Sequence, residues 1–267
     1  MNELSFTEIY PKIYVYKNLF KNTQDIIDIL NDVDENSFLG QWEDWYTFGK
    51  EIDTININSQ ETEKTKKELL MWKEIEEIFY KTTNHYAEVH GIKIDTIDEK
   101  WRKMGPSFCK YEPGSGVTDD LAMHYHTDYQ IERKEERGYK FAITCTMYLN
   151  DNYKGGGIDF YINKKLFYYK PKAGDVIVFP SGDPNIISDK DELYHHGVKK
   201  CFDFPKYFIR NNWTYFYPGS EEWIKNESFY GEEIWKKMED DRIKEGKSKG
   251  IYQLINEKEI REAVRIQ

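Results

Sequence analysis

The stretch "YKFAITCTMYLNDNYKGGG", residues 139–157, sets the fold class that the sequence predicts. Its apolar, aromatic and β-branched run ends in Asn, Asp and three glycines, a pattern typical of a strand followed by a turn. The same pattern recurs after Trp101 in "PSFCKYEPGSG" (106–116), "IDFYINKKLFYYKPKAGD" (158–175), "VIVFPSGDPN" (176–185) and "KYFIRNNWTYFYPGS" (206–220). Short strands between turns favour an antiparallel sandwich or jelly roll over βαβ units.

Helical patterns flank these strands on both sides. Residues 23–33 place apolar side chains at helical spacing behind a Thr or Asn cap. Residues 61–90 predict a longer helix, and its apolar stripe consists of Leu69, Trp72, Ile75, Phe79, Tyr86 and Val89. Charged sequence with a helical pattern returns beyond residue 218. We therefore predict one domain over 1–267, with an N-terminal helical support region (1–100), a β core (101–217) and a C-terminal helical extension (218–267).

Composition limits the classes of partner. The formal net charge of -10 argues against binding to nucleic acid or an anionic membrane, because such binding needs clustered Lys and Arg. The three cysteines lack any CxxC spacing, so we expect reduced core residues. The N-terminal sequence carries acids and lysines where a signal peptide needs an apolar run, and this predicts a cytoplasmic protein. The oligomeric state is left open.

A second stretch, "LAMHYHTDYQ" (121–130), predicts chemistry. His124, His126 and Asp128 alternate, so in a strand they share one face. The segment "YHHGVKKC" adds His195 and His196 about 70 residues later. Two imidazoles and one carboxylate leave three metal positions open, the arrangement that non-haem Fe(II) oxygenases use.

Six blocks of sequence occur in the order expected of one enzyme family. They are "KYEPGSG", "HTD", "TCTMYLNDNYKGGGIDFY", "KPKAGDVIVFPS", "HHGV" and "KYFIRNNW", spread over roughly 105–217. Together they resemble the prolyl 4-hydroxylase-like branch of the 2-oxoglutarate/Fe(II)-dependent dioxygenases. The resemblance implies a mainly β chain with flanking helices (α+β) around a catalytic double-stranded β-helix (jelly-roll) core.

The resemblance also implies a ligand set for iron, which is His126, Asp128 and His196. His196 is chosen over His195 because the family pattern HxV fits "HGV", and successive strand residues point to opposite faces. His124 is then assigned beside the metal site or at the substrate entrance, with a plain solvent-facing strand position as the alternative.

For the far carboxylate of 2-oxoglutarate, the family places a Lys or Arg about ten residues after the distal histidine. Lys206 lies at this position, and Arg210 is the second choice because it shares the same strand face. The resemblance assigns Tyr148 to a hydrogen bond with that carboxylate and Tyr111 to the lining of the site. Core packing is the alternative for each tyrosine.

The activity implied is that of a hydroxylase that uses Fe(II), 2-oxoglutarate and O₂ and releases succinate and CO₂, with ascorbate as a further candidate cofactor. The resemblance favours a prolyl or other side chain in a peptide or protein as the substrate. A free amino acid or other small molecule, or a non-catalytic jelly-roll binding module, are the alternatives. Asp128 favours hydroxylation over halogenation, because related halogenases replace this carboxylate with a small residue. The run "ERKEERGYK" (132–140) is interpreted as a solvated loop or a substrate lid.

Overall fold

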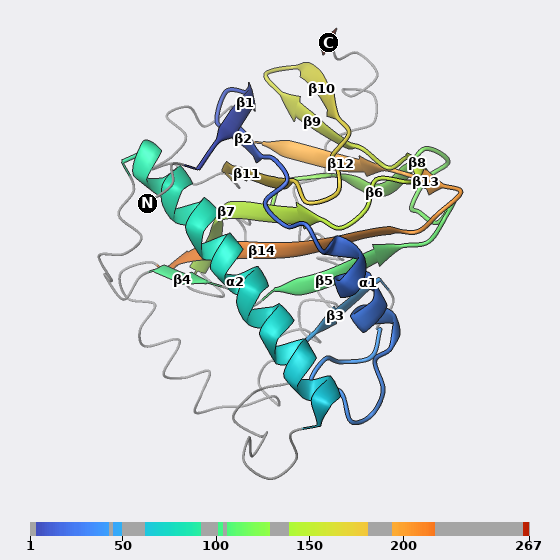
Figure 1. The fold of residues 1–267 in the computed structure, drawn as a ribbon. Coiled ribbons are helices and arrows are strands. Elements are labelled where there is room, and N and C mark those ends of the chain that lie inside the picture. Colours follow the sequence, from blue (N-terminus) through green and yellow to red (C-terminus); the bar gives the residue numbers. More distant parts are fainter. Residues whose placement is uncertain are drawn as a thin grey trace, which may run out of the picture.

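Two β-sheets face each other and a long helix covers the larger one (Figure 1). The structure is a computed structural model that describes residues 4–42, 45–49, 62–91, 101–103, 106–128, 139–180, 194–216 and 264–266. The sheets are mostly antiparallel, which confirms the prediction of a mainly β jelly-roll core with flanking helices.

The larger sheet, called the major sheet below, has eight strands. Its path is β1 (Phe6–Tyr10), β2 (Ile13–Tyr16), β11 (Val176–Pro180), β7 (Tyr139–Tyr148), β14 (Lys206–Phe216), β5 (Ser107–Tyr111) and β3 (Tyr46–Phe48), with β4 (Trp101–Lys103) also paired to β14. All neighbours run antiparallel, and the longest pairing joins β7 to β14. These two strands form the centre of the fold.

The smaller sheet, called the minor sheet, supplies the second layer. It is formed by β15 (Val264–Ile266), β10 (Lys165–Tyr169), β9 (Ile158–Ile162), β12 (His195–Lys199) and β6 (Leu121–His126), in that order. β15 pairs with β10 in parallel, while the other neighbours run antiparallel. A separate pair joins β8 (Lys154–Gly155) to β13 (Cys201–Phe202).

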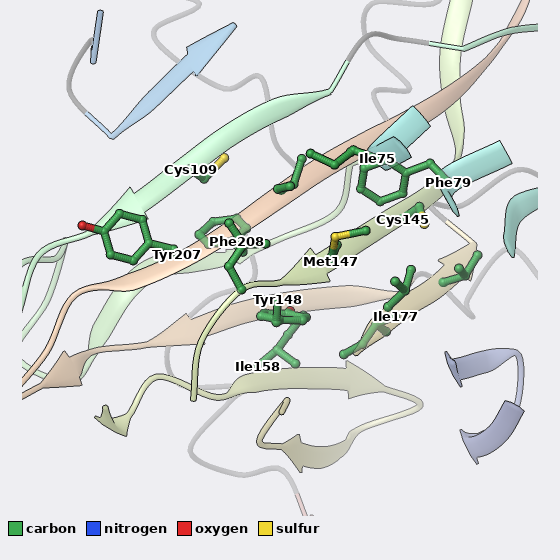
Figure 2. Close-up of a cluster of buried hydrophobic side chains, with 14 of the residues drawn as sticks. Ile75, Phe79, Cys109, Cys145, Met147, Tyr148, Ile158, Ile177, Tyr207 and Phe208 are labelled. Atoms are coloured by element: carbon green, nitrogen blue, oxygen red, sulfur yellow. The ribbon is translucent and has the colours of Figure 1, made fainter. Parts of the chain in front are cut away.

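Alternation along β7 gives the major sheet two distinct faces. Cys145 points to the outer face, where helix α2 (Glu63–Val89) lies across the sheet (Figure 1), and its Sγ atom is 3.6 Å from Thr82 Oγ1. Ile75 and Phe79 of α2 are fully buried on this side (Figure 2). The opposite face of the major sheet, called the inner face below, is directed at the minor sheet, because Phe179 of β11 packs against Phe160 of β9.

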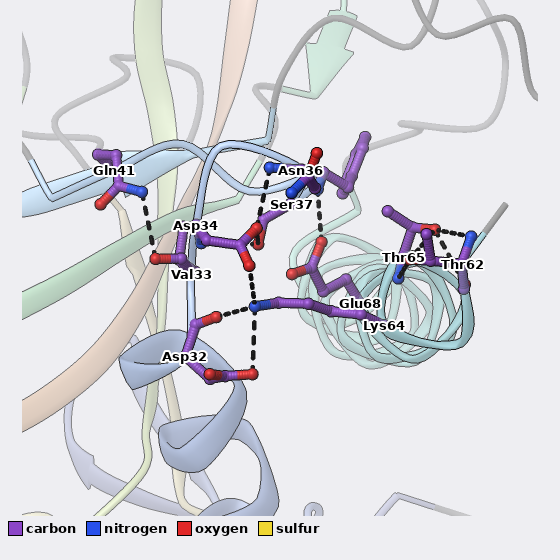
Figure 3. Close-up of polar contacts among 11 residues, drawn as sticks. Asp32, Val33, Asp34, Asn36, Ser37, Gln41, Thr62, Lys64, Thr65 and Glu68 are labelled. Atoms are coloured by element: carbon purple, nitrogen blue, oxygen red, sulfur yellow. Dashed lines mark hydrogen bonds and ion pairs between the residues drawn. The ribbon is translucent and has the colours of Figure 1, made fainter. Parts of the chain in front are cut away.

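The amino end of α2 is fixed to the segment that follows helix α1 (Thr23–Asn31). Lys64 lies 3.1 Å from Asp32 and 3.0 Å from Asp34, and the buried carboxylate of Glu68 accepts a hydrogen bond from the Phe38 amide at 2.5 Å (Figure 3). Thr62 caps the helix through its reciprocal hydrogen bonds with Thr65. The exposed ion pairs add little stability by themselves, so the buried Glu68 contact matters more here.

The sequence predicted both helices and missed several strands. The expected helices at 23–33 and 61–90 are confirmed as Thr23–Asn31 and Glu63–Val89. Val89, however, is 49% exposed and lies outside the buried stripe. The three cysteines are free and buried, as expected.

The predicted N-terminal helical support region (1–100) also contains strands, because β1, β2 and β3 extend the major sheet on its two sides. The sequence "IYVY" of β2 is buried at every position, so its alternation is hidden. Most of the predicted C-terminal helical extension lies outside the described residues, and its described part, β15, is a strand. The division into one domain with three regions stays a prediction.

Packing of α2 on the outer face predicts how substitutions in this helix change the free energy of unfolding. We expect Phe79→Ala to lower the free energy of unfolding by about 3–5 kcal/mol, because the side chain is completely buried. Leu70→Ala is the matched control on the same helix, since Leu70 is 66% exposed and the change should stay within about 0.5 kcal/mol. Urea denaturation measures both. Equal effects of the two substitutions would contradict the placement of α2.

Candidate active site

Three predicted ligands come together between the sheets. β6 pairs with β12 so that His126 lies opposite His196, and Asp128 follows two residues after β6 ends. The Nε2 atom of His126 is 3.6 Å from Asp128 Oδ1, and the Nε2 atom of His196 is 3.8 Å from Asp128 Oδ2. One donor atom from each side chain lies within 4.8 Å of the other two, and all three residues are buried.

The backbone orients both imidazoles. The Nδ1 atom of His126 is 2.7 Å from the carbonyl oxygen of His124, and the Nδ1 atom of His196 is 3.2 Å from the carbonyl oxygen of Tyr194. A carbonyl oxygen only accepts hydrogen bonds, so each Nδ1 must carry the proton. Each Nε2 atom therefore presents its lone pair toward Asp128, which is the tautomer that metal ligation needs.

The charges of the cluster favour a bound cation. Burial raises the pKa of Asp128, but His196, His126 and Arg210 outweigh this effect and hold it well below its usual range. Burial and the nearby His126 lower the pKa of His196 to about 4, so this imidazole is neutral at physiological pH. Thr144 Oγ1 donates a hydrogen bond to Asp128 Oδ2 at 2.6 Å. A fixed carboxylate and two imidazoles on one side suit Fe(II) with open coordination positions.

The structure also corrects the geometry expected of "LAMHYHTDYQ". We predicted that Asp128 shares a strand face with His126, but β6 ends at His126 and Asp128 lies in a bend. The side chains of His124 and His195 are not part of the three-residue cluster, and both residues are only partly buried. His124 contributes its backbone carbonyl to the orientation of His126.

Strand β14 carries the remaining candidates along the inner face. Alternation places Lys206, Phe208, Arg210 and Asn212 on this face, and β7 pairs Phe208 with Tyr148, Arg210 with Thr146, and Asn212 with Thr144. Because Thr144 bonds Asp128, the Asn212 end of this row lies beside the candidate metal ligands. Lys206 is the member farthest from them along the strand.

Lys206 is a buried cation surrounded by aromatic rings. Its side chain is 1% exposed, and its Nζ atom donates a hydrogen bond to the Gly156 carbonyl at 2.6 Å and lies 5.1 Å from the ring centroid of Tyr148. Burial lowers the pKa of Lys206 to about 7. Burial also raises the pKa of Tyr148, which therefore stays a neutral phenol. The Lys206 ammonium and the neutral Tyr148 hydroxyl can both donate hydrogen bonds to a carboxylate.

The two remaining candidates meet at Trp45. Tyr111 is buried and stacks on the Trp45 ring with centroids 5.8 Å apart, and it also contacts Phe208. The guanidinium carbon of Arg210 lies 5.6 Å from the centroid of the same Trp45 ring. Tyr111 thus forms part of an aromatic wall, which is compatible with both its predicted alternatives.

Sequence reasoning missed three residues at this site. Thr144 orients Asp128, and alternation with Tyr148 in "TCTMY" was the signal that could have found it. Trp45 lies far from the motifs in sequence. The ring centroid of Tyr153 lies 6.0 Å from Lys206 Nζ, and its buried hydroxyl has no hydrogen-bond partner within the described part of the chain. Residues 132–138 of the predicted lid lie outside the described residues, and residues 139–140 belong to β7.

Part of the chain that contains this site matches a known protein family. Residues 110–215, which include all three ligands and Lys206, match the family model of the 2OG-Fe(II) oxygenase superfamily. This segment is a 2OG-Fe(II) oxygenase domain. The chain is accordingly an enzyme of the 2OG-dependent dioxygenase class, with Fe(II) as cofactor and 2-oxoglutarate as cosubstrate. No curated protein sequence matches it significantly.

Two solved plant dioxygenases share the fold of the oxygenase domain. The dioxygenase for auxin oxidation 1 from Arabidopsis thaliana, solved with 2-oxoglutarate, is 13% identical with a TM-score of 0.50, and the match covers 78% of this chain and 84% of that one. The auxin dioxygenase of rice is 10% identical with a TM-score of 0.50, over 75% and 72% of the two chains. A viral collagen prolyl hydroxylase from Paramecium bursaria Chlorella virus-1 is 19% identical with a TM-score of 0.48, over 81% and 100%.

The described part of the oxygenase chain contains no helix with the length and apolar character needed to cross a membrane. The cytoplasmic location stays a prediction from the sequence.

The choice of His196 over its neighbour can be tested without turnover. We expect His196→Ala to weaken Mn(II) binding by at least about 100-fold, because a ligand is lost from a three-residue set. His195→Ala should bind Mn(II) within about threefold of the unchanged chain, because this side chain lies outside the cluster. Calorimetric titration of the metal-free protein measures both. Stronger dependence on His195 would contradict the assignment.

Proposed function

We propose that this oxygenase is a hydroxylase that couples the oxidation of an unactivated C–H bond to the decarboxylation of 2-oxoglutarate. The buried cluster of His126, Asp128 and His196 carries the proposal, because its donor set leaves coordination positions for cosubstrate and O₂. When bound, Fe(II) supplies the oxidising chemistry that no side chain can provide. Retention of the Asp128 carboxylate favours hydroxylation over halogenation.

The residues of the chain do the positioning. The carbonyls of His124 and Tyr194 fix the imidazole tautomers, and Thr144 holds the Asp128 carboxylate. Burial of the ligands excludes bulk water from the reacting atoms, which protects them from side reactions.

We assign the far carboxylate of 2-oxoglutarate to Lys206, with Tyr148 beside it. Lys206 and Arg210 are four residues apart on one strand face, about 13 Å between Cα atoms, so one of them can take this role. Of the two cations, Arg210 lies nearer to the proposed metal ligands. A cosubstrate bound at the metal would extend away from the metal, and this favours the more distant Lys206 as the partner of its far carboxylate. The burial of Lys206 and its aromatic surroundings also support the assignment, since a buried carboxylate needs a charged partner.

The substrate class has two candidates. The resemblance to prolyl hydroxylases favours a prolyl or other side chain in a peptide or protein. A free amino acid or other small molecule is the second candidate. The partners we propose are therefore a peptide, protein or small-molecule substrate, and the acidic balance of charge argues against nucleic acid and an anionic membrane.

The proposed reaction predicts strict dependence on the cluster. We expect release of succinate from 2-oxoglutarate to require Fe(II) and to fall by at least about 1000-fold in His126→Ala and in Asp128→Ala, since either change removes a ligand. Succinate assays with and without Fe(II) measure this dependence. Full activity in either variant would rule out the ligand set.

The lowered pKa of Lys206 predicts the pH dependence of cosubstrate binding. Below pH 7 the lysine is already charged, whereas above about pH 7 it must take up a proton to pair with 2-oxoglutarate. Affinity should therefore fall as pH rises from 7 to 8.5, by up to about tenfold per pH unit. His196 does not titrate in this window, because its pKa is about 4.

Calorimetric titration of 2-oxoglutarate into the Mn(II)-loaded protein measures this slope. Lys206→Met should bind 2-oxoglutarate at least about tenfold more weakly at pH 7 and should lose the slope. Arg210→Gln should keep it. The opposite pattern would transfer the carboxylate anchor to Arg210.

A further inference from the structure

The hydroxyl of Tyr153 is a buried hydrogen-bonding group that the described part of the fold does not use. The side chain is 3% exposed, and its hydroxyl oxygen has no hydrogen-bond partner among the described residues. The hydroxyl of the buried Tyr86, by contrast, donates to the Lys12 carbonyl at 3.0 Å. A buried hydroxyl without a partner lowers stability, so a bound molecule that accepts this hydrogen bond would account for it.

Contacts within the fold hold the Tyr153 ring in place. Tyr153 and Gly156 flank β8, and a Cβ atom at Gly156 would lie 2.4 Å from Tyr153 Cε2, so the close packing of the ring requires glycine. The Nζ atom of Lys170 lies 4.4 Å from the ring centroid and also donates a hydrogen bond to the Tyr153 carbonyl. The phenol is therefore oriented before a ligand binds, which reduces the entropic cost of binding.

The same glycine brings Tyr153 next to Lys206. The Gly156 carbonyl accepts the hydrogen bond from Lys206 Nζ, which lies 6.0 Å from the ring centroid of Tyr153. The ring centroid of Tyr148 is 5.1 Å from the same Nζ atom. Lys206 is 1% exposed, and no carboxylate among the described residues forms an ion pair with it. Two phenols beside a buried cation suit an anion that offers several acceptor sites.

We propose that the Tyr153 hydroxyl donates a hydrogen bond to the far carboxylate of 2-oxoglutarate, which Lys206 and Tyr148 also contact. The inference rests on the proposed function, in which Lys206 binds this carboxylate. A carboxylate has two oxygens and about four lone-pair sites, so it can accept hydrogen bonds from all three side chains. Tyr153 is thus a cosubstrate-binding residue, and it favours 2-oxo acids that end in a second carboxylate over those that end in a methyl group.

The test combines a change of residue with a change of ligand. Calorimetry measures the binding of 2-oxoglutarate and of 2-oxopentanoate, which has a methyl group in place of the far carboxylate, to the Mn(II)-loaded protein. We expect Tyr153→Phe to weaken 2-oxoglutarate binding about tenfold and to leave 2-oxopentanoate binding within about twofold, because the lost hydrogen bond goes to the far carboxylate. Equal weakening of both ligands, or an unchanged affinity for 2-oxoglutarate, would overturn the inference.

Tyr86→Phe is the matched control, because it also removes one buried tyrosine hydroxyl. This hydroxyl is used inside the fold, so its loss should lower Tm by about 2–4 °C and leave the affinity for 2-oxoglutarate within about twofold. Tyr153→Phe should not lower the Tm of the ligand-free protein, since the hydroxyl that it removes has no partner among the described residues. A lower Tm with unchanged affinity in Tyr153→Phe would show a structural role only and would contradict the proposal.

The two levels of the proposal fail differently. If 2-oxoglutarate does not bind the unchanged Mn(II)-loaded protein, or binds Lys206→Met equally well, the proposed function or its carboxylate anchor fails and the inference fails with it. If 2-oxoglutarate binds and depends on Lys206 but not on Tyr153, only the inference fails.

Discussion

The antiparallel pairing of β7 with β14 is the constraint on which the site depends. This pairing fixes which side chains of the two central strands face inward. A one-residue shift of either strand would turn its own inward side chains, Thr144 and Tyr148 of β7 or Lys206 and Arg210 of β14, to the helix-covered face. The burial of Cys145, Met147 and Ile209 against the outer layer makes such a shift expensive. Hydrophobic packing by α2 on one side therefore sets the register of the polar groups on the other.

The electrostatics of the inner face follow a gradient along β14. At one end the Asp128 carboxylate lies beside two imidazoles, and at the other a buried lysine has its pKa lowered to about 7. The two ends carry opposite tendencies, one for a cation and one for an anion, so the row would suit a dicarboxylate beside a metal held by His126, Asp128 and His196. Each end is buried, and burial is what makes both preferences strong.

Much of this could be read from the sequence, and the omissions have physical causes. Short strands between glycine and asparagine turns predicted the core, and helical spacing predicted Thr23–Asn31 and Glu63–Val89 to within two residues at each end. The strand β2 was missed because all four of its residues are buried, which removes the alternation that marks a strand. The pair of His126 and Asp128 was found, yet a bend and not a shared strand face brings them together. Trp45 could not be found, because only tertiary structure places it over Arg210.

Main-chain carbonyls orient the imidazoles of both His126 and His196. This orientation does not depend on the identity of the surrounding side chains. Backbone oxygens belong to every sequence with this fold, so the aim of His126 and His196 tolerates replacement of the side chains around them. Such a catalyst can diverge: a lineage could exchange the side chains around the cluster while the main chain keeps both imidazoles in place.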